Sequence, residues 1–146
     1  MKKFLAMLLA VVMTLALAAC GGGNKDSNSS AFKVGGTGPL TGAAAIYGNA
    51  AANGAKIAVD EINAMGGIQF ELNYQDDVHD AEKAVNAYNN LKDWGMQLSL
   101  GSVTSAPCNA TAAETYSDRI FALTPSASAP TVIEGKDNMF QMCFLD

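Results

Sequence analysis

The chain has 146 residues, of which 49% are hydrophobic and 16% charged, and its formal net charge is −5. This length suits one domain of ordinary size, and the apolar fraction excludes a mainly disordered chain. The acidic excess excludes the clustered positive charge that a nucleic-acid partner would require. Three cysteines are too few for a disulfide scaffold.

The first twenty residues have the layout of an export signal. Lys2 and Lys3 form a positive start, an uncharged apolar run covers 4–19, and Cys20 follows. This layout predicts a secretory signal peptide over 1–19. The run is short for a membrane span, and three glycines follow Cys20 at once.

Cys20 directly after Leu-Ala-Ala resembles a bacterial lipobox. The resemblance implies that diacylglycerol is attached to the Cys20 thiol and that the chain is cut just before it. The acidic mature chain would then be held at the membrane by its lipid and not by a basic patch. The alternative is plain secretion with an incidental cysteine. Residues 20–31, rich in Gly and Ser, are expected to form a flexible tether.

From residue 32 onward, short strands alternate with helices. The first helix shows the clearest period, because its apolar residues recur at spacings of three and four and share one face. The segment 68–75 alternates strictly between apolar and polar residues, which indicates a half-buried strand at a sheet edge. Asp80 is expected to cap the second helix. The predicted strands are 32–36, 68–75, 96–100, 120–124 and 139–144, and the predicted helices are 47–65, about 81–94 and 107–117.

This alternation predicts an α/β domain over 32–146 with a doubly wound parallel sheet in the flavodoxin-like order 2-1-3-4-5. Ligands bind such sheets outside the carboxyl ends of the strands. Three loops are expected there, 35–47, 101–107 and 125–130, and none contains Lys, Arg, Asp or Glu. Backbone amides, hydroxyls and helix N-termini would suit a carboxylate, and they are poor groups for catalysis. We therefore expect a binding site without a cofactor, and no enzyme.

The sequence gives weaker support for a nucleotide-binding site, a metal site or a hydrolase site. Gly36 to Gly42 only partly matches a dinucleotide-binding fingerprint, because its third glycine comes one residue late and Pro39 stands where the helix should begin. The acidic run 76–80 offers four metal ligands, but a polar loop with a helix cap explains it better, and no metal site is expected. A hydrolase reading lacks a base near Ser105 or Ser126, since His79 is the sole histidine.

Cys108 and Cys143 form an even pair in a chain predicted to be exported. They can form a disulfide or remain as two buried thiols, and sequence alone does not fix the distance between them.

Several motifs together resemble the periplasmic leucine/isoleucine/valine-binding protein family, the substrate-binding proteins of branched-chain amino-acid ABC transporters. The resemblance covers about residues 32–146, and the order and spacing of the motifs carry it. The motifs are the lipobox, Gly38-Pro39-Leu40-Thr41-Gly42, Tyr47-Gly48, Asn53-Gly54, Ala58 to Asn63, Gly66-Gly67-Ile68, Tyr74 to Asp77, the loop 101–107 and Thr124-Pro125-Ser126.

The resemblance implies a fold of two α/β lobes with the amino-acid ligand between them. It assigns the ligand carboxylate to Ser105, beside Thr104, and contacts with the carboxylate and ammonium to Ser126, Ala127 and Ser128. It also implies that Tyr47 packs on the ligand. The family's ammonium-binding acid lies in the second lobe, so we expect this chain to be the first lobe of a longer protein.

Some relatives carry a disulfide between the loops after strands two and three. Here those places hold His79 and Thr104, so that bridge cannot form. The resemblance implies a lipid-anchored, extracytoplasmic binding protein that delivers an amino acid to a membrane permease. The alternatives are a sensing receptor module of the same fold, an exported flavodoxin-like enzyme, and the product of a pseudogene without function.

Overall fold

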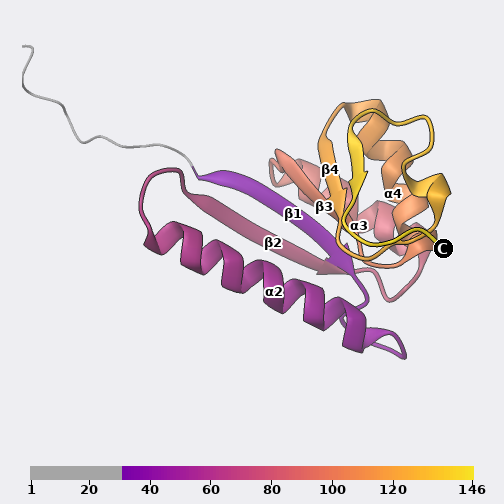
Figure 1. Ribbon diagram of the computed structural model, residues 1–146, viewed down its shortest axis with the longest axis horizontal. Helices are drawn as coiled ribbons and strands as arrows, with labels where there is room; N and C mark the ends of the chain where they lie inside the picture. Colours follow the sequence, from indigo (N-terminus) through magenta and orange to yellow (C-terminus); the bar gives the residue numbers. More distant parts are fainter. Residues whose placement is uncertain (1–30) are drawn as a thin grey trace, which may run out of the picture. The chain divides into compact units, whose positions relative to one another are not determined.

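The structure is a computed structural model that describes residues 31–146. Five strands form one sheet in the order β2-β1-β3-β4-β5, and every neighbouring pair is parallel (Figure 1). The predicted doubly wound order, with the second strand at an edge, is confirmed. The strands are β1 (Phe32–Gly38), β2 (Phe70–Asp76), β3 (Leu98–Ser102), β4 (Phe121–Thr124) and β5 (Met139–Gln141).

Three α-helices connect the strands: α2 (Ala45–Ala64), α3 (Ala81–Asp93) and α4 (Ser105–Asp118). The predicted cap of α3 is confirmed, because the Asp80 carboxylate accepts the amide of Lys83 at 2.9 Å. A short 3-10 helix, η1 (Pro130–Val132), lies between β4 and β5.

Several predicted boundaries were wrong by a few residues. The fifth strand ends at Gln141 and not at 144, because its one partner, β4, ends at Thr124. The third strand runs over 98–102 and not 96–100, since the Met96 amide is bonded back to the Leu91 carbonyl at the end of α3. Helix α4 begins at Ser105 and not at Pro107, so Ser105 lies in the first turn of a helix rather than in a loop.

The two faces of the sheet are covered unequally. Helices α3 and α4 pack side by side on one face, where Tyr88, Leu91 and Met96 form one buried cluster and residues from α4, β4, η1 and β5 form a second. Helix α2 lies on the opposite face and packs against β1 and β2 (Figure 1). The predicted apolar face of α2 does turn toward the sheet, yet Gly48 is its only buried residue.

Gly48 sets how closely α2 approaches the end of β1. A Cβ atom at this position would lie 2.1 Å from the carbonyl oxygen of Pro39, which is a backbone atom that cannot move aside alone. Only glycine lets the helix sit at this distance. The contact places the first turn of α2, including Tyr47, at the carboxyl end of β1.

The predicted signal peptide over 1–19, the predicted lipidation site Cys20 and all of the predicted tether except residue 31 lie outside the described residues. Within 31–146, no helix is both long and apolar enough to cross a membrane.

Candidate functional site

Because all five strands are parallel, their carboxyl ends bring the following loops to one edge of the sheet. Residues 39–44 follow β1, 77–80 follow β2, 103–104 follow β3, and 125–129 follow β4. The candidate ligand-binding residues predicted from the sequence all lie in these loops or in the first helical turn after them.

The N-terminus of α4 carries the clearest binding feature. Thr104 is the N-cap residue, and its side chain makes no capping hydrogen bond. The first bonded amide of the helix is that of Cys108, which donates to the Thr104 carbonyl at 2.9 Å, and Pro107 has no amide hydrogen. Among the described hydrogen bonds, the amides of Ser105 and Ala106 therefore have no acceptor, and such amides attract anions.

The Thr104 hydroxyl is held from outside its own helix. A hydrogen bond of 2.8 Å joins Thr104 Oγ1 to Nδ1 of His79, in the loop after β2. The two positions at which some relatives carry a disulfide are thus linked by a noncovalent contact. His79 and its neighbour Val78 both have left-handed backbone conformations, with φ of 60° and 52°.

Ser105 joins this helix start to the loop after β4. Its hydroxyl oxygen accepts the amide of Ala129 at 3.3 Å. Ser126 lies exposed in the same loop. The Ser128 hydroxyl donates to the Asp146 carboxylate at 2.7 Å. The structure therefore brings Ser105 together with the loop that contains Ser126 and Ser128.

Ala127 differs from its neighbours, because its backbone groups are already used inside the protein. Its amide donates to Thr124 Oγ1 at 3.1 Å, and its carbonyl accepts Gln141 Nε2 at 2.6 Å and Cys143 Sγ at 3.2 Å. The residue is buried. In this arrangement Ala127 fixes the loop, while the hydroxyl residues on either side of it remain nearer to solvent.

Tyr47 is 63% exposed in the first turn of α2. Within residues 31–146, no hydrogen bond joins its side chain to the other candidate residues, so its predicted contact with a ligand stays a prediction.

Asp76 ties the loop after β1 to the loop after β2. Its carboxylate accepts the Leu40 amide at 2.8 Å, the Thr41 hydroxyl at 2.5 Å and the Val78 amide at 2.9 Å. Desolvation acts to raise the pKa of Asp76, but the bonds from Thr41, Val78 and Leu40 outweigh it and hold that pKa below its usual value. Asp76 therefore stays charged and holds these two loops together.

Asp77 points into the domain and is fully buried. One carboxylate oxygen accepts the His79 amide at 2.9 Å, and the other, Oδ2, has no hydrogen-bond partner in the described part of the chain. Burial raises the pKa of Asp77, against the opposing effect of the His79 amide. Within 31–146, no three His, Cys, Asp or Glu side chains gather as metal ligands.

Both cysteines of the described chain are free thiols. Cys108 is buried in the first turn of α4, and burial raises the pKa of its thiol. Cys143 is half-buried and donates to the Ala127 carbonyl. The thiols therefore help to pack the same loop that carries the candidate hydroxyl residues.

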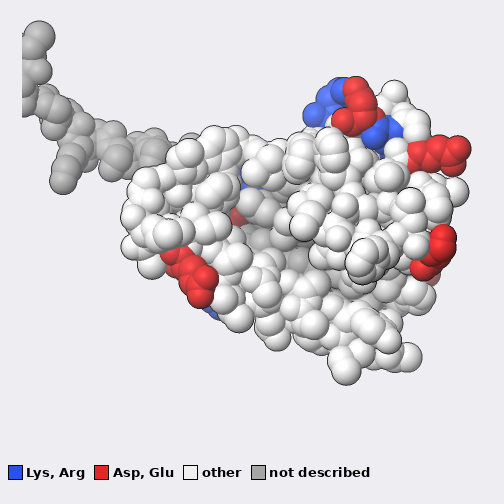
Figure 2. Space-filling model, in the orientation of Figure 1, with Lys and Arg blue, Asp and Glu red and all other residues white. Residues whose placement is uncertain are grey.

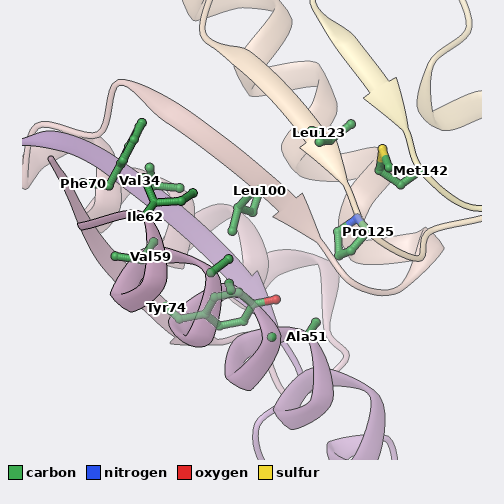
Figure 3. Close-up of a pocket in the computed structure, with 13 residues that line it drawn as sticks. Val34, Ala51, Val59, Ile62, Phe70, Tyr74, Leu100, Leu123, Pro125 and Met142 are labelled. Carbon is green, nitrogen blue, oxygen red and sulfur yellow. The ribbon is translucent and has the colours of Figure 1, made fainter. Parts of the chain in front are cut away.

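A separate apolar groove of about 470 Å³ lies between α2 and the sheet (Figure 3). None of the predicted ligand-binding residues lines it. Charged side chains are sparse on this face of the molecule and gather at its margins (Figure 2). The groove is lined by Ala51, Gly54, Ala55, Ala58, Val59 and Ile62 of α2, and by Val34, Phe70, Tyr74, Leu100, Leu123, Pro125 and Met142 of the sheet and its loops.

Sequence reasoning missed the two loop-to-loop contacts made by Asp76 and His79. The polar run 76–80 was interpreted as a loop with a helix cap, which accounts for Asp80 alone. Left-handed conformations at Val78 and His79 leave no sequence signal, since neither residue is a glycine. The one signal in the sequence was the acidic pair Asp76 and Asp77 at the end of β2, whose side chains can accept hydrogen bonds from neighbouring loops.

The comparisons with known proteins agree with the fold. A family model described as a periplasmic binding protein matches residues 31–145. The Leu/Ile/Val-binding protein BraC3 of Rhizobium johnstonii is 36% identical over 112 residues, which are 74% of this chain and 30% of that protein.

Solved structures give the same result. The branched-chain amino acid transporter substrate-binding protein LivJ of Streptococcus pneumoniae, in complex with isoleucine, matches with a TM-score of 0.74 and 30% identity, over 79% of this chain and 34% of that one. A solute-binding protein of an ABC transporter from R. palustris, in complex with benzoate, matches with a TM-score of 0.72 and 25% identity, over 79% and 33%.

The chain spans about a third of the length of these relatives. The family model nevertheless covers nearly all of the described residues, and the observed fold is the α/β sheet that the resemblance implied. The chain belongs to the periplasmic binding protein family, and within it resembles the branched-chain amino-acid binding proteins.

Proposed function

We propose that this chain is the first ligand-binding lobe of the substrate-binding component of an ABC transporter, and that it captures branched-chain or similar amino acids outside the cytoplasmic membrane. The proposal is of a binding role and not of an enzyme. The observation that carries it is the start of α4, where the amides of Ser105 and Ala106 are unpaired and the surrounding loops contain no competing Lys or Arg.

The ligands of two relatives support a carboxylate at this position. Two of the matched proteins were solved in complex with isoleucine and with benzoate, which share a carboxylate and little else. A helix N-terminus with free amides stabilises such a group by hydrogen bonds and by its dipole. The hydroxyls of Ser105 and Ser126 would add donors beside it.

We propose further that the ligand is held between this lobe and a second one. The basis is that the chain spans about a third of its relatives and that its candidate site lies open at one edge of the sheet. Closure of two lobes by a hinge motion would then enclose the ligand, and the closed form would be the one recognised by a membrane permease.

The lipid anchor at Cys20 belongs to the same proposal and rests on the lipobox-like sequence. Cells that express the full chain and are fed radiolabelled palmitate should yield a labelled protein in the membrane fraction. Cys20→Ser should abolish the label, and Cys143→Ser should leave it unchanged. Equal labelling of the Cys20→Ser variant would contradict the anchor.

The test of ligand binding is a calorimetric titration of the full chain with isoleucine, benzoate and isoleucinamide. Isoleucine should bind and isoleucinamide, which lacks the carboxylate, should not. Ser105→Ala should weaken isoleucine binding by about fivefold, the effect of one net hydrogen bond. Ser117→Ala, at the exposed far end of α4, is the matched control. Equal binding of isoleucine and isoleucinamide would contradict the assignment of the ligand carboxylate to the start of α4.

A further inference from the structure

We infer that His79 is a positioning residue of this site: it holds the Thr104 hydroxyl and thereby keeps the Ala106 amide of α4 free for an anionic ligand. The part that concerns the ligand rests on the proposed function. The part that concerns the hydrogen bonding of α4 can be measured on the protein alone.

The first step is the backbone of the loop after β2. Val78 and His79 are consecutive non-glycine residues with φ of 52° and 60°, a conformation that costs free energy and persists only where surrounding bonds enforce it. The neighbouring carboxylates supply those bonds. Asp76 accepts the Val78 amide and Asp77 accepts the His79 amide, both at 2.9 Å. The Asp80 amide closes the turn on the Asp77 carbonyl at 2.9 Å.

The second step is what this conformation does with the imidazole. It directs Nδ1 of His79 at Thr104 Oγ1, 2.8 Å away, across 25 residues of sequence. The strained turn thus links the loop after β2 to the start of α4.

The third step is the competition for the Thr104 hydroxyl. A threonine at an N-cap ordinarily accepts the second or third amide of its helix. The third residue of α4 is Pro107, which has no amide hydrogen, so only the Ala106 amide could be capped. In the structure Thr104 makes no capping bond, and its hydroxyl is paired with His79 instead. By fixing the orientation of this hydroxyl, His79 keeps it away from the Ala106 amide, which stays available to a ligand.

The experiment uses three substitutions that separate strain from hydrogen bonding. His79→Gly keeps the left-handed turn without strain and removes the imidazole. His79→Asn also tolerates that turn and places a polar atom at the δ position. Thr104→Val removes only the hydroxyl. Solvent exchange of the Ala106 amide is followed by NMR in the ¹⁵N-labelled full chain without ligand.

In His79→Gly the freed hydroxyl should cap Ala106 and slow exchange of its amide about fivefold, as a net hydrogen bond would. Adding Thr104→Val to His79→Gly should restore fast exchange, and His79→Asn should resemble the wild type. Since the chain has a single histidine, its Nδ1 resonance is unambiguous and should shift in Thr104→Val. Identical Ala106 exchange in the wild type and His79→Gly would overturn the inference.

Isoleucine titration then tests the consequence for binding. His79→Gly should weaken isoleucine about fivefold and His79→Asn should restore it. If isoleucine binds the wild type and His79→Gly equally well, the positioning role is overturned. If isoleucine does not bind the wild type at all, the assignment of an amino-acid site to this lobe by itself fails, and the Ala106 exchange measurement still decides whether His79 controls the cap.

Discussion

The two faces of the sheet differ in how well their helices cover them. A helix with large apolar side chains buries much of the sheet, and a helix with small ones buries little. On the face under α3 and α4, Leu91 and Tyr88 are buried in a packed cluster. On the face under α2, the helix presents alanines, and a groove of about 470 Å³ remains. A parallel sheet is normally covered on both faces. Hydrophobic stabilisation is therefore concentrated on the α3 and α4 side.

The side chains of the strands also show that the two faces of the sheet are covered unequally. Successive side chains of a strand point to opposite faces. In β5, Met139 is buried against α4, whereas the next residue, Phe140, is half exposed and stacks on Phe121 of β4 at 5.3 Å between ring centroids. These aromatic side chains lie on the α2 side, beyond the reach of α2 itself. Exposed aromatic side chains of β4 and β5 therefore lie where α2 does not cover the sheet.

The largest expected effect comes from comparing one truncation on each face. Leu91 is 1% exposed and Ile62 is 39% exposed. Leu91→Ala should lower the free energy of unfolding by about 3 kcal/mol, because it leaves a cavity in a packed core, and Ile62→Ala by less than about 1 kcal/mol. Urea unfolding of both variants measures this. Equal losses would break the contrast between the two faces.

The next effect concerns Asp76, the half-buried member of the acidic pair. Asp76→Asn should destabilise the protein by about 1 kcal/mol at pH 7, a value limited by solvent screening. Since the folded-state pKa of Asp76 is lowered, its contribution is present above the unfolded pKa and is lost as pH falls through the folded one. Urea unfolding at pH 7 and pH 3 should show the difference between wild type and variant shrinking in acid.

Its neighbour Asp77, which is fully buried, should behave in the opposite sense. Because burial raises the folded-state pKa of Asp77, the ionised form opposes folding at neutral pH. Asp77→Asn should therefore stabilise the protein at pH 7 by about 1 kcal/mol. The gain should vanish as pH falls through the raised pKa toward the unfolded value, where the wild type takes up its proton. Thermal unfolding between pH 7 and pH 3 measures this, and a gain that grows in acid would contradict it.

The smallest effect is a partial filling of the groove. Ala55 lines the groove, whereas Ala50 on the same helix is exposed and does not. Ala55→Leu should raise the free energy of unfolding by about 0.5 kcal/mol and reduce the fluorescence of bound anilinonaphthalene sulfonate. Ala50→Leu is the matched control and should do neither. Equal behaviour of the two variants would mean that the groove does not hold the added side chain.

Much of the architecture was predictable because local periodicity reports which face of an element is apolar. The spacing of Ala51, Ala55, Ala58 and Ile62 fixed the face of α2 that now lines the groove. The strict alternation over 68–75 identified the edge strand β2. Element ends were less predictable, as at Gln141, because a strand stops where its partner stops and not where its own apolar residues stop.

The candidate site was predictable in its loops and not in its contacts. Thr104, Ser105 and Ser126 were expected at the carboxyl ends of the strands, and they lie there. That the Ala127 backbone is engaged by Thr124, Gln141 and Cys143 could not be foreseen, since those partners depend on how β4 and β5 align.

The sequence by itself determined the order of strands and helices, the uncharged character of the binding loops and the family, because these follow from periodicity, composition and motif spacing. The tertiary structure alone decided which polar groups are free. His79 meets Thr104 through a left-handed turn that two carboxylates enforce, and α2 leaves a groove because alanines cannot reach the far strands. Both outcomes depend on distances between segments far apart in the chain, which no local pattern records.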